Sequence, residues 1–387
     1  MDVKWGFNMK VIISPDSYKG TLSAFDVANA MQRGILDVDP SIETVILPVA
    51  DGGEGTLASL IASTGGRYIT ENVLDPLGRT IEAKFGVLGD EETCVIEMAQ
   101  ASGITLLQDS EKNPELASTY GTGQLIVAAL DKGFRKFIIG IGGSATNDAG
   151  VGLLKALGLQ FYKEDGTAIA NGVSALLDLA SIDSSQLDAR LSEATFTIAC
   201  DVDNPLIGER GATAIFGPQK GVKEHEIAYF DQCLKQFADI VEKQFHIRLH
   251  DYKGAGAAGG VGGALIAFLN GTFHAGIDIV IEAVQLKRHL KDAQIVLTGE
   301  GKSDRQTLHG KAPLGVALAA KSSNVKAVLL SGAIDKEDKP VLLNYFAVVE
   351  SLVDESTTVL QAMQEPYRLI RQKTKKIIEN TVNMGDE

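Results

Sequence analysis

Four short stretches combine carboxylates with glycine or proline: SPDSYKG (14–20), ADGGEGT (50–56), CDVDNP (200–205) and TGEGKSD (298–304). Each follows an apolar run of strand-like length. Because the carboxyl ends of strands in an open α/β sheet face the ligand crevice, we expect these acids to share a site. Their oxygen ligands suit Mg²⁺, which takes one or two carboxylates together with substrate phosphates. The alternative for any single loop is a helix cap.

A glycine-rich stretch, GIGGSATNDAGVG at 140–152, follows the apolar run KFIIG. Glycine leaves backbone N–H groups open to a ligand, so Gly142, Gly143 and Ser144 predict an anion site where a strand passes into a helix. Asn147 adds a polar side chain in the same turn. The alternative is a loop that serves close packing only.

Three other kinds of site fit the sequence less well. Gly140, Gly142 and Ala145 match the dinucleotide pattern G-x-G-x-x-A, but the acid expected about twenty residues later falls in the polar turn YKEDGTAI. The run GKS at 301–303 resembles the end of a P-loop, yet Val296 stands where its first glycine is required. The six histidines form no H-E-x-x-H pair, and no G-x-S-x-G marks a serine nucleophile.

Composition narrows the class of protein. The chain has 387 residues, which favours two domains, and its net charge of −14 argues against a surface for nucleic acid or an anionic membrane. An anionic substrate would therefore need local cations or a metal ion. The three cysteines form no C-x-x-C pair and predict reduced thiols in the cytoplasm. Residues 1–8 are too polar for a signal peptide, and no apolar run reaches the length of a membrane helix.

The elements that position these residues alternate between strand and helix patterns at both ends of the chain. KVIIS predicts a buried strand, and TLSAFDVANAMQRGILDV predicts a helix capped by Thr21 or Ser23. Near residue 76 the pattern changes to period two, and GRTIEAKFGVLG and ETCVIEMAQ predict antiparallel strands. Strand–helix alternation returns from about 275. We predict a discontinuous parallel α/β domain of residues 9–75 and 276–387, with a mixed α/β domain, 76–275, inserted into it.

The ordered motifs PDSYKGTLSA, PVADGGEGT, GIGGSATNDAGVG, CDVDNPLIG, GAGAAGG and TGEGKSDRQTLHGKAPLGVA closely resemble those of the bacterial type 1 glycerate kinases. The resemblance runs from about residue 9 to about 375. It implies ATP-dependent phosphorylation of D-glycerate with Mg²⁺, and it favours 2-phosphoglycerate over 3-phosphoglycerate as the product. It also implies two α/β domains, one flavodoxin-like and one with a mixed sheet, with the site in the cleft between them.

We infer roles within this reaction from the charges of the side chains, because phosphoryl transfer depends mostly on positioning and on electrostatic stabilisation. We expect Asp304 to orient or deprotonate the attacking hydroxyl, with Lys19 as a cation beside the transferred group. The remaining expectations concern binding: Gly142, Gly143, Ser144, Asn147 and Lys302 for ATP phosphates; Asp16, Arg79, Arg305 and Glu54 for substrate; Asp201 and Glu300 for metal.

Several alternatives stay open on the sequence. Asp304 could instead cap the helix carrying KAPLGVALAA, and the base role would then pass to Asp201 or Asp148. A dinucleotide-dependent oxidoreductase acting on a small hydroxy acid is the second candidate function.

Overall fold

A computed structural model of the chain describes residues 9–50 and 56–383 and contains two compact units. Among the described residues, unit 1 comprises 9–50, 58–65 and 275–383, and unit 2 comprises 56–57 and 66–274. In this part of the chain no helix has the length and apolar character that crossing a membrane requires.

Unit 1 contains a five-stranded, fully parallel sheet in the order β15-β13-β11-β1-β2. Renumbered along the unit, this order is the flavodoxin-like 2-1-3-4-5, which confirms the predicted fold class. The strands are β1 (Lys10–Ile13), β2 (Glu43–Ile46), β11 (Ile295–Thr298), β13 (Lys326–Ser331) and β15 (Val348–Ser351). A short parallel ribbon joins β12 (Lys302–Ser303) to β14 (Ala333–Ile334).

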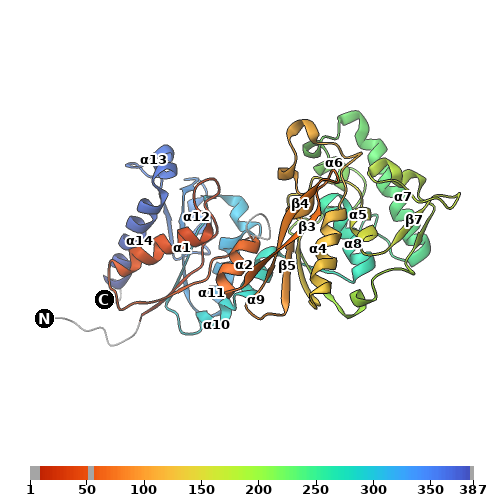
Figure 1. Ribbon diagram of the computed structural model, residues 1–387. Helices are drawn as coiled ribbons and strands as arrows, with labels where there is room; N and C mark the ends of the chain where they lie inside the picture. Colours follow the sequence, from red (N-terminus) through yellow and green to blue (C-terminus); the bar gives the residue numbers. More distant parts are fainter. Residues whose placement is uncertain (1–8, 51–55, 384–387) are drawn as a thin grey trace. The chain divides into compact units, whose positions relative to one another are not determined.

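Helices of unit 1 include the predicted α1, which begins after the N-cap Ser23, whose hydroxyl accepts the N–H of Asp26 at 3.1 Å. Helix α1 packs beside α14 (Figure 1). Arg371 of α14 forms an ion pair with Asp37, which follows α1. The helices are α1 (Ala24–Leu36), α2 (Thr56–Thr64, shared with unit 2), α9 (Gly276–Ala283), α10 (Leu286–Leu290), α11 (Ala312–Ser322), α12 (Lys339–Leu342), α13 (Val359–Gln364), α14 (Pro366–Asn383) and the 3-10 helix η8 (Arg305–Leu308).

Unit 2 contains a six-stranded mixed sheet in the order β10-β9-β6-β5-β4-β3. Strands β3, β4 and β5 run antiparallel, as the period-two pattern predicts for β4 and β5, and β5, β6, β9 and β10 run parallel. Because β3 pairs with β4 along its whole length, residues 67–74 belong to unit 2. The strands are β3 (Arg67–Leu74), β4 (Thr80–Val87), β5 (Thr93–Glu97), β6 (Lys136–Gly140), β9 (Thr195–Ala199) and β10 (Thr272–His274), with a separate hairpin of β7 (Gln160–Tyr162) and β8 (Ser181–Asp183).

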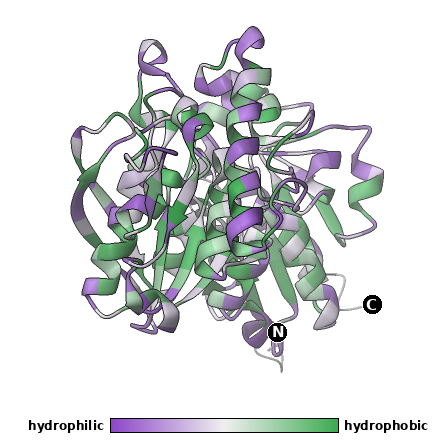
Figure 2. Cartoon of the chain, turned by 90° about the vertical axis from the view of Figure 1, so that its right-hand side faces the viewer, coloured by the Kyte–Doolittle hydropathy of each residue, from purple (hydrophilic) through white to green (hydrophobic). Residues whose placement is uncertain are grey.

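The core of unit 2 lies between this sheet and its helices. Phe137 of β6 and Phe196 of β9 stack with ring centroids 4.8 Å apart, and both are buried. Figure 2 shows apolar residues concentrated on the strands and hydrophilic residues along outer helix surfaces. The helices are α3 (Ala99–Ser102), α4 (Tyr120–Asp131), α5 (Val151–Ala156), α6 (Ala212–Phe216), α7 (Ile227–Phe245) and α8 (Val261–Leu269), with 3-10 helices that include η5 (Pro218–Lys220) and η7 (Ala257–Gly260).

The GAGAAGG motif, residues 254–260, packs against the loop that follows β6. Gly259 has φ +68°, and a Cβ atom there would lie 2.1 Å from the carbonyl oxygen of Thr146. Its own carbonyl accepts the N–H of Ala149 at 2.9 Å. The motif therefore fixes the loop after β6 through a close backbone approach that a side chain would block.

We predict that Gly259→Ala lowers the free energy of unfolding by on the order of 3 kcal/mol, since it adds overpacking to a strained left-handed backbone. Gly166→Ala is the matched control: Gly166 also has a positive φ, +80°, but a Cβ atom there meets nothing within 4 Å. Urea unfolding of the two variants gives the comparison. Equal losses in both would show that the contact with Thr146 has no energetic role.

Candidate active site

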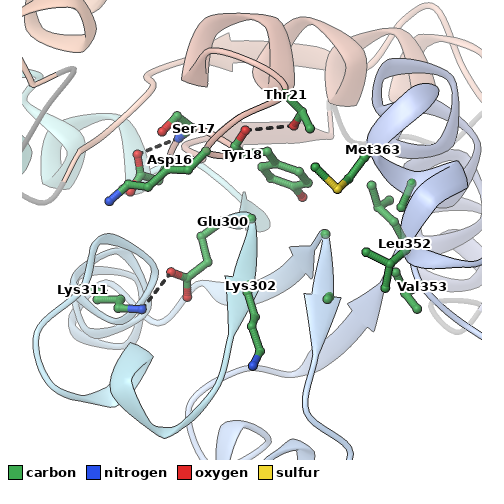
Figure 3. A pocket seen from close by; sticks show the side chains of 16 residues that line it. Asp16, Ser17, Tyr18, Thr21, Glu300, Lys302, Lys311, Leu352, Val353 and Met363 are labelled. Atoms are coloured by element: carbon green, nitrogen blue, oxygen red, sulfur yellow. Dashed lines mark hydrogen bonds and ion pairs between the residues drawn. The ribbon is translucent and has the colours of Figure 1, made fainter. Parts of the chain in front are cut away.

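A pocket of about 420 Å³ lies at the carboxyl edge of the unit 1 sheet. The segments after β1, β11, β13 and β15 all contribute to its wall (Figure 3). It therefore spans β1 and β11, the neighbouring strands at which the strand order reverses and where open α/β sheets bind ligands. Four of the residues expected from the sequence line it: Asp16, Lys19, Glu300 and Lys302.

Close backbone contacts hold these loops together. The N–H groups of Gly332 and Ala333 donate to the carbonyls of Glu300 and Gly301, each at 3.0 Å. A Cβ atom on Gly332 would lie 2.4 Å from the carbonyl oxygen of Gly301, so only glycine allows this approach. The loop that carries Glu300 and Lys302 is thereby fixed to the end of β13.

Glu300 has a buried, hydrogen-bonded carboxylate. Its Oε1 accepts the hydroxyl of Ser303 at 2.9 Å and that of Thr307 at 2.6 Å, while Oε2 lies 3.7 Å from Nζ of Lys311 (Figure 3). Burial raises the pKa of this carboxyl, against the opposing effects of Thr307 and Lys311. The side chain is held in one orientation by three partners.

Asp16 is the second buried carboxylate of the pocket, 8% exposed. One of its oxygens accepts the N–H of Ser17 at 2.6 Å, and its own N–H donates to the carbonyl of Gly299 at 2.9 Å. No group of three His, Cys, Asp or Glu side chains suited to a metal occurs among the described residues. Two carboxylates nevertheless fit Mg²⁺, which completes its coordination with water and substrate phosphates.

The basic residues that follow Glu300 form ion pairs with acids of the segment after β14. Nζ of Lys302 lies 3.0 Å from Oδ2 of Asp335, and Nε of Arg305 lies 2.8 Å from Oδ1 of Asp338. Asp304 is the N-cap of η8: it accepts the N–H of Gln306 at 2.8 Å and does not line the pocket. The capping alternative therefore has structural support, although the capped element is η8 rather than α11, which starts after Lys311.

In unit 2, the loop after β6 exposes Gly142 and Gly143. Gly143 has φ +71°, and its carbonyl accepts the N–H of Ile104 at 2.8 Å. Within the described ranges, no acceptor takes the N–H of either glycine. Two open N–H groups are consistent with the predicted anion site.

The loop does not open a helix directly, which differs from the expectation. Helix α5 begins only at Val151, because Ala149 and Gly150 before it have left-handed φ values of +53° and +73°. The carboxylate of Asp148 in this turn is buried. It accepts the N–H groups of Gly150 and Gly152 at 3.1 Å, and both the N–H and the hydroxyl of Thr119. Burial raises the pKa of Asp148, and these hydrogen bonds oppose the shift. A dinucleotide fingerprint requires the helix at the turn, so its structural context is missing.

Lys220, at the end of η5, is a residue that the sequence analysis missed. It is 1% exposed, and its ammonium donates to the hydroxyl of Ser144 at 2.8 Å and to the carbonyl of Thr146 at 2.7 Å. Burial lowers the pKa of Lys220 to about 7, and the charge of Asp148 opposes that shift. The glycine loop is thus anchored on the side chain of a buried lysine.

Two other residues of unit 2 that were expected to bind ATP or substrate already have side-chain partners. Asn147 is buried and donates to the hydroxyl of Thr213 at 2.9 Å. Arg79 already pairs with Asp75 at 2.5 Å and Glu111 at 2.6 Å.

Asp201 is exposed after β9, the neighbour of β6, so it follows the same edge of the sheet as Gly142. Glu54 lies outside the described residues.

Comparison with known proteins identifies the relatives of this chain. Residues 11–382 match the glycerate kinase family. The chain is 46% identical to the glycerate kinase of Bacillus subtilis strain 168 and 42% identical to the glycerate 2-kinase of Escherichia coli K12, in both cases over 95% of this chain and 97% of the relative. A crystal structure assigned to glycerate kinase 2 of Salmonella typhimurium LT2 superposes with a TM-score of 0.89 at 40% identity, covering 98% of this chain and all of the other. The chain therefore belongs to the glycerate kinase family.

Proposed function

We propose that the protein transfers the γ-phosphoryl group of ATP to D-glycerate, with Mg²⁺, and that the product is 2-phosphoglycerate. Family membership supports glycerate as the substrate, and the relative named glycerate 2-kinase supports the position. The observation that carries the proposal is the pocket of unit 1, which gathers Lys19, Lys302 and Lys311 with two buried carboxylates at one sheet edge. These are the charges that a metal-bound polyphosphate requires, and an oxidoreductase has no need of them.

The pocket charges have distinct proposed tasks. The lysines attract phosphate oxygens, and Asp16 and Glu300 would hold Mg²⁺, which neutralises charge on the transferred phosphoryl group when bound. Asp201, on unit 2, stays a predicted ligand. For the carboxylate of D-glycerate, Arg305 has more hydrogen-bonding capacity left than Arg79, since its terminal nitrogens have no acceptor in the described part of the chain.

The glycine loop of unit 2 supplies a second anion site in this proposal. Gly142 and Gly143 present backbone N–H groups, and the Lys220 ammonium lies buried beneath Ser144. When protonated, this buried lysine gives the loop a positive potential in a protein whose net charge is −14. We propose that a phosphate group of the substrates binds here.

The proposal also includes the cellular compartment in which the reaction takes place. All three cysteines, Cys94, Cys200 and Cys233, are free thiols. Free thiols suit a reducing compartment, and a small-molecule kinase needs ATP, so we place the enzyme in the cytoplasm with D-glycerate and ATP as its small-molecule substrates.

We predict that the protein consumes ATP when D-glycerate and Mg²⁺ are present, and that enolase alone converts the product to phosphoenolpyruvate, which is followed by ultraviolet absorbance. EDTA should abolish the reaction and excess Mg²⁺ should restore it. A product that enolase accepts only after phosphoglycerate mutase is added would instead be 3-phosphoglycerate. Reduction of NAD⁺ or NADP⁺ by the protein with D-glycerate, and no use of ATP, would overturn the proposal.

A second prediction tests whether Asp304 is the acid that orients the hydroxyl, with Asp16, a proposed Mg²⁺ ligand, as the comparison. Asp16 is buried on the pocket wall, whereas Asp304 caps η8. Asp16→Asn should lower kcat at least ~100-fold, because it removes a carboxylate that would hold Mg²⁺ beside the transferred phosphoryl group. Asp304→Asn should stay within about threefold of wild type, because Asn caps nearly as well as Asp. A large fall in Asp304→Asn at unchanged Tm would return the role to Asp304, as the sequence first suggested.

A further inference from the structure

The unit 1 pocket has an apolar end that the proposed chemistry does not use. Figure 3 shows Leu352, Val353 and Met363 gathered on one side and Glu300 and Lys311 on the other. Val359 and Ala362 complete the apolar wall. One end of the pocket is therefore charged, and the opposite end is apolar.

The apolar wall is preformed and partly open to solvent. Val359 and Met363 are separated by one helical turn of α13 and are 57% and 55% exposed. Helix α13 starts with a capping box, in which Thr358 and Gln361 exchange side-chain and backbone hydrogen bonds. A ligand placed here would remove apolar surface from water without reorganising the helix.

Size and chemistry select the occupant. A three-carbon hydroxy acid is polar throughout and much smaller than about 420 Å³, so it cannot cover this wall. The ligand must carry an apolar group at one end and several negative charges at the other, to meet Lys19 and Lys302. A nucleoside triphosphate has this form, and the pocket lies at the strand-order reversal where parallel α/β sheets bind nucleotides.

We propose that the adenine ring of ATP binds against Val359 and Met363 at the apolar end, with its phosphates directed toward Lys19 and Lys302. This inference rests on the proposed function, because it takes ATP as the co-substrate. It assigns nucleotide recognition to the segment 352–363, which none of the acidic or glycine-rich motifs includes.

The test places a carboxylate at the apolar end. Met363→Asp should raise the KM for ATP at least ~10-fold, because burying a charge against an adenine ring is costly, while the KM for D-glycerate stays within about twofold. Leu360→Asp is the matched control: Leu360 lies on the same helix, is 65% exposed and does not line the pocket. It should leave both KM values unchanged. Calorimetry with ADP on each full-length variant should show the same ranking.

Other outcomes separate this inference from the proposed function. A normal KM for ATP in an active Met363→Asp enzyme would overturn the adenine assignment and leave the kinase reaction standing. A raised KM for D-glycerate alone would assign the apolar end to the acid and also overturn it. If the wild-type protein did not phosphorylate D-glycerate, the proposed function would fail, yet ADP binding that Met363→Asp weakens would still support the nucleotide site.

Discussion

The contact between the Lys220 ammonium and the loop after β6 is the interaction on which unit 2 depends for its site. Nζ of Lys220 is buried and donates to Ser144 and Thr146, so the charge is held by two oxygens rather than by a direct carboxylate partner. Leaving a charge in such a position is costly, and the lowered pKa of Lys220 reflects this cost. A bound anion would offset it. The arrangement is therefore the one expected of an anion-binding site at this loop.

The loop after β6 is also fixed at its C-terminal end. Asp148 takes four hydrogen bonds, two of them from the backbone that leads into α5, and Gly259 packs directly on Thr146. With both ends held, only Gly142 and Gly143 remain at the surface. In unit 1 the corresponding rigidity comes from Glu300, which Ser303 and Thr307 hold at the edge of the parallel sheet. Both units thus place charge at the carboxyl ends of strands.

Local patterns in the sequence were sufficient to predict much of this. The apolar runs of β1, β6, β9, β11 and β13, the N-cap Ser23 and the acids that follow the strands are local features, and Asp16 and Glu300 do meet in one pocket. Residues that depend on distant parts of the chain were not predictable. Arg79 is paired with Glu111, 32 positions away, and Lys220 bonds to Ser144, 76 positions away. A lysine in the polar run GPQKGVK reads as a surface residue, since nothing local signals its burial.

The measurement that tests this account most directly is the affinity for MgATP of wild type and Lys220→Met as a function of pH, with Lys220→Arg as the control that keeps a cation. Lys220 carries its charge below about pH 7 and loses it above. Asp148 is the neighbouring charge that acts on it. At about pH 6 the wild type should bind MgATP at least ~10-fold more tightly than Lys220→Met, and the difference should shrink as the pH rises toward 9. A correctly folded Lys220→Met protein with wild-type affinity at every pH would contradict the claim that this buried cation forms part of the phosphate site.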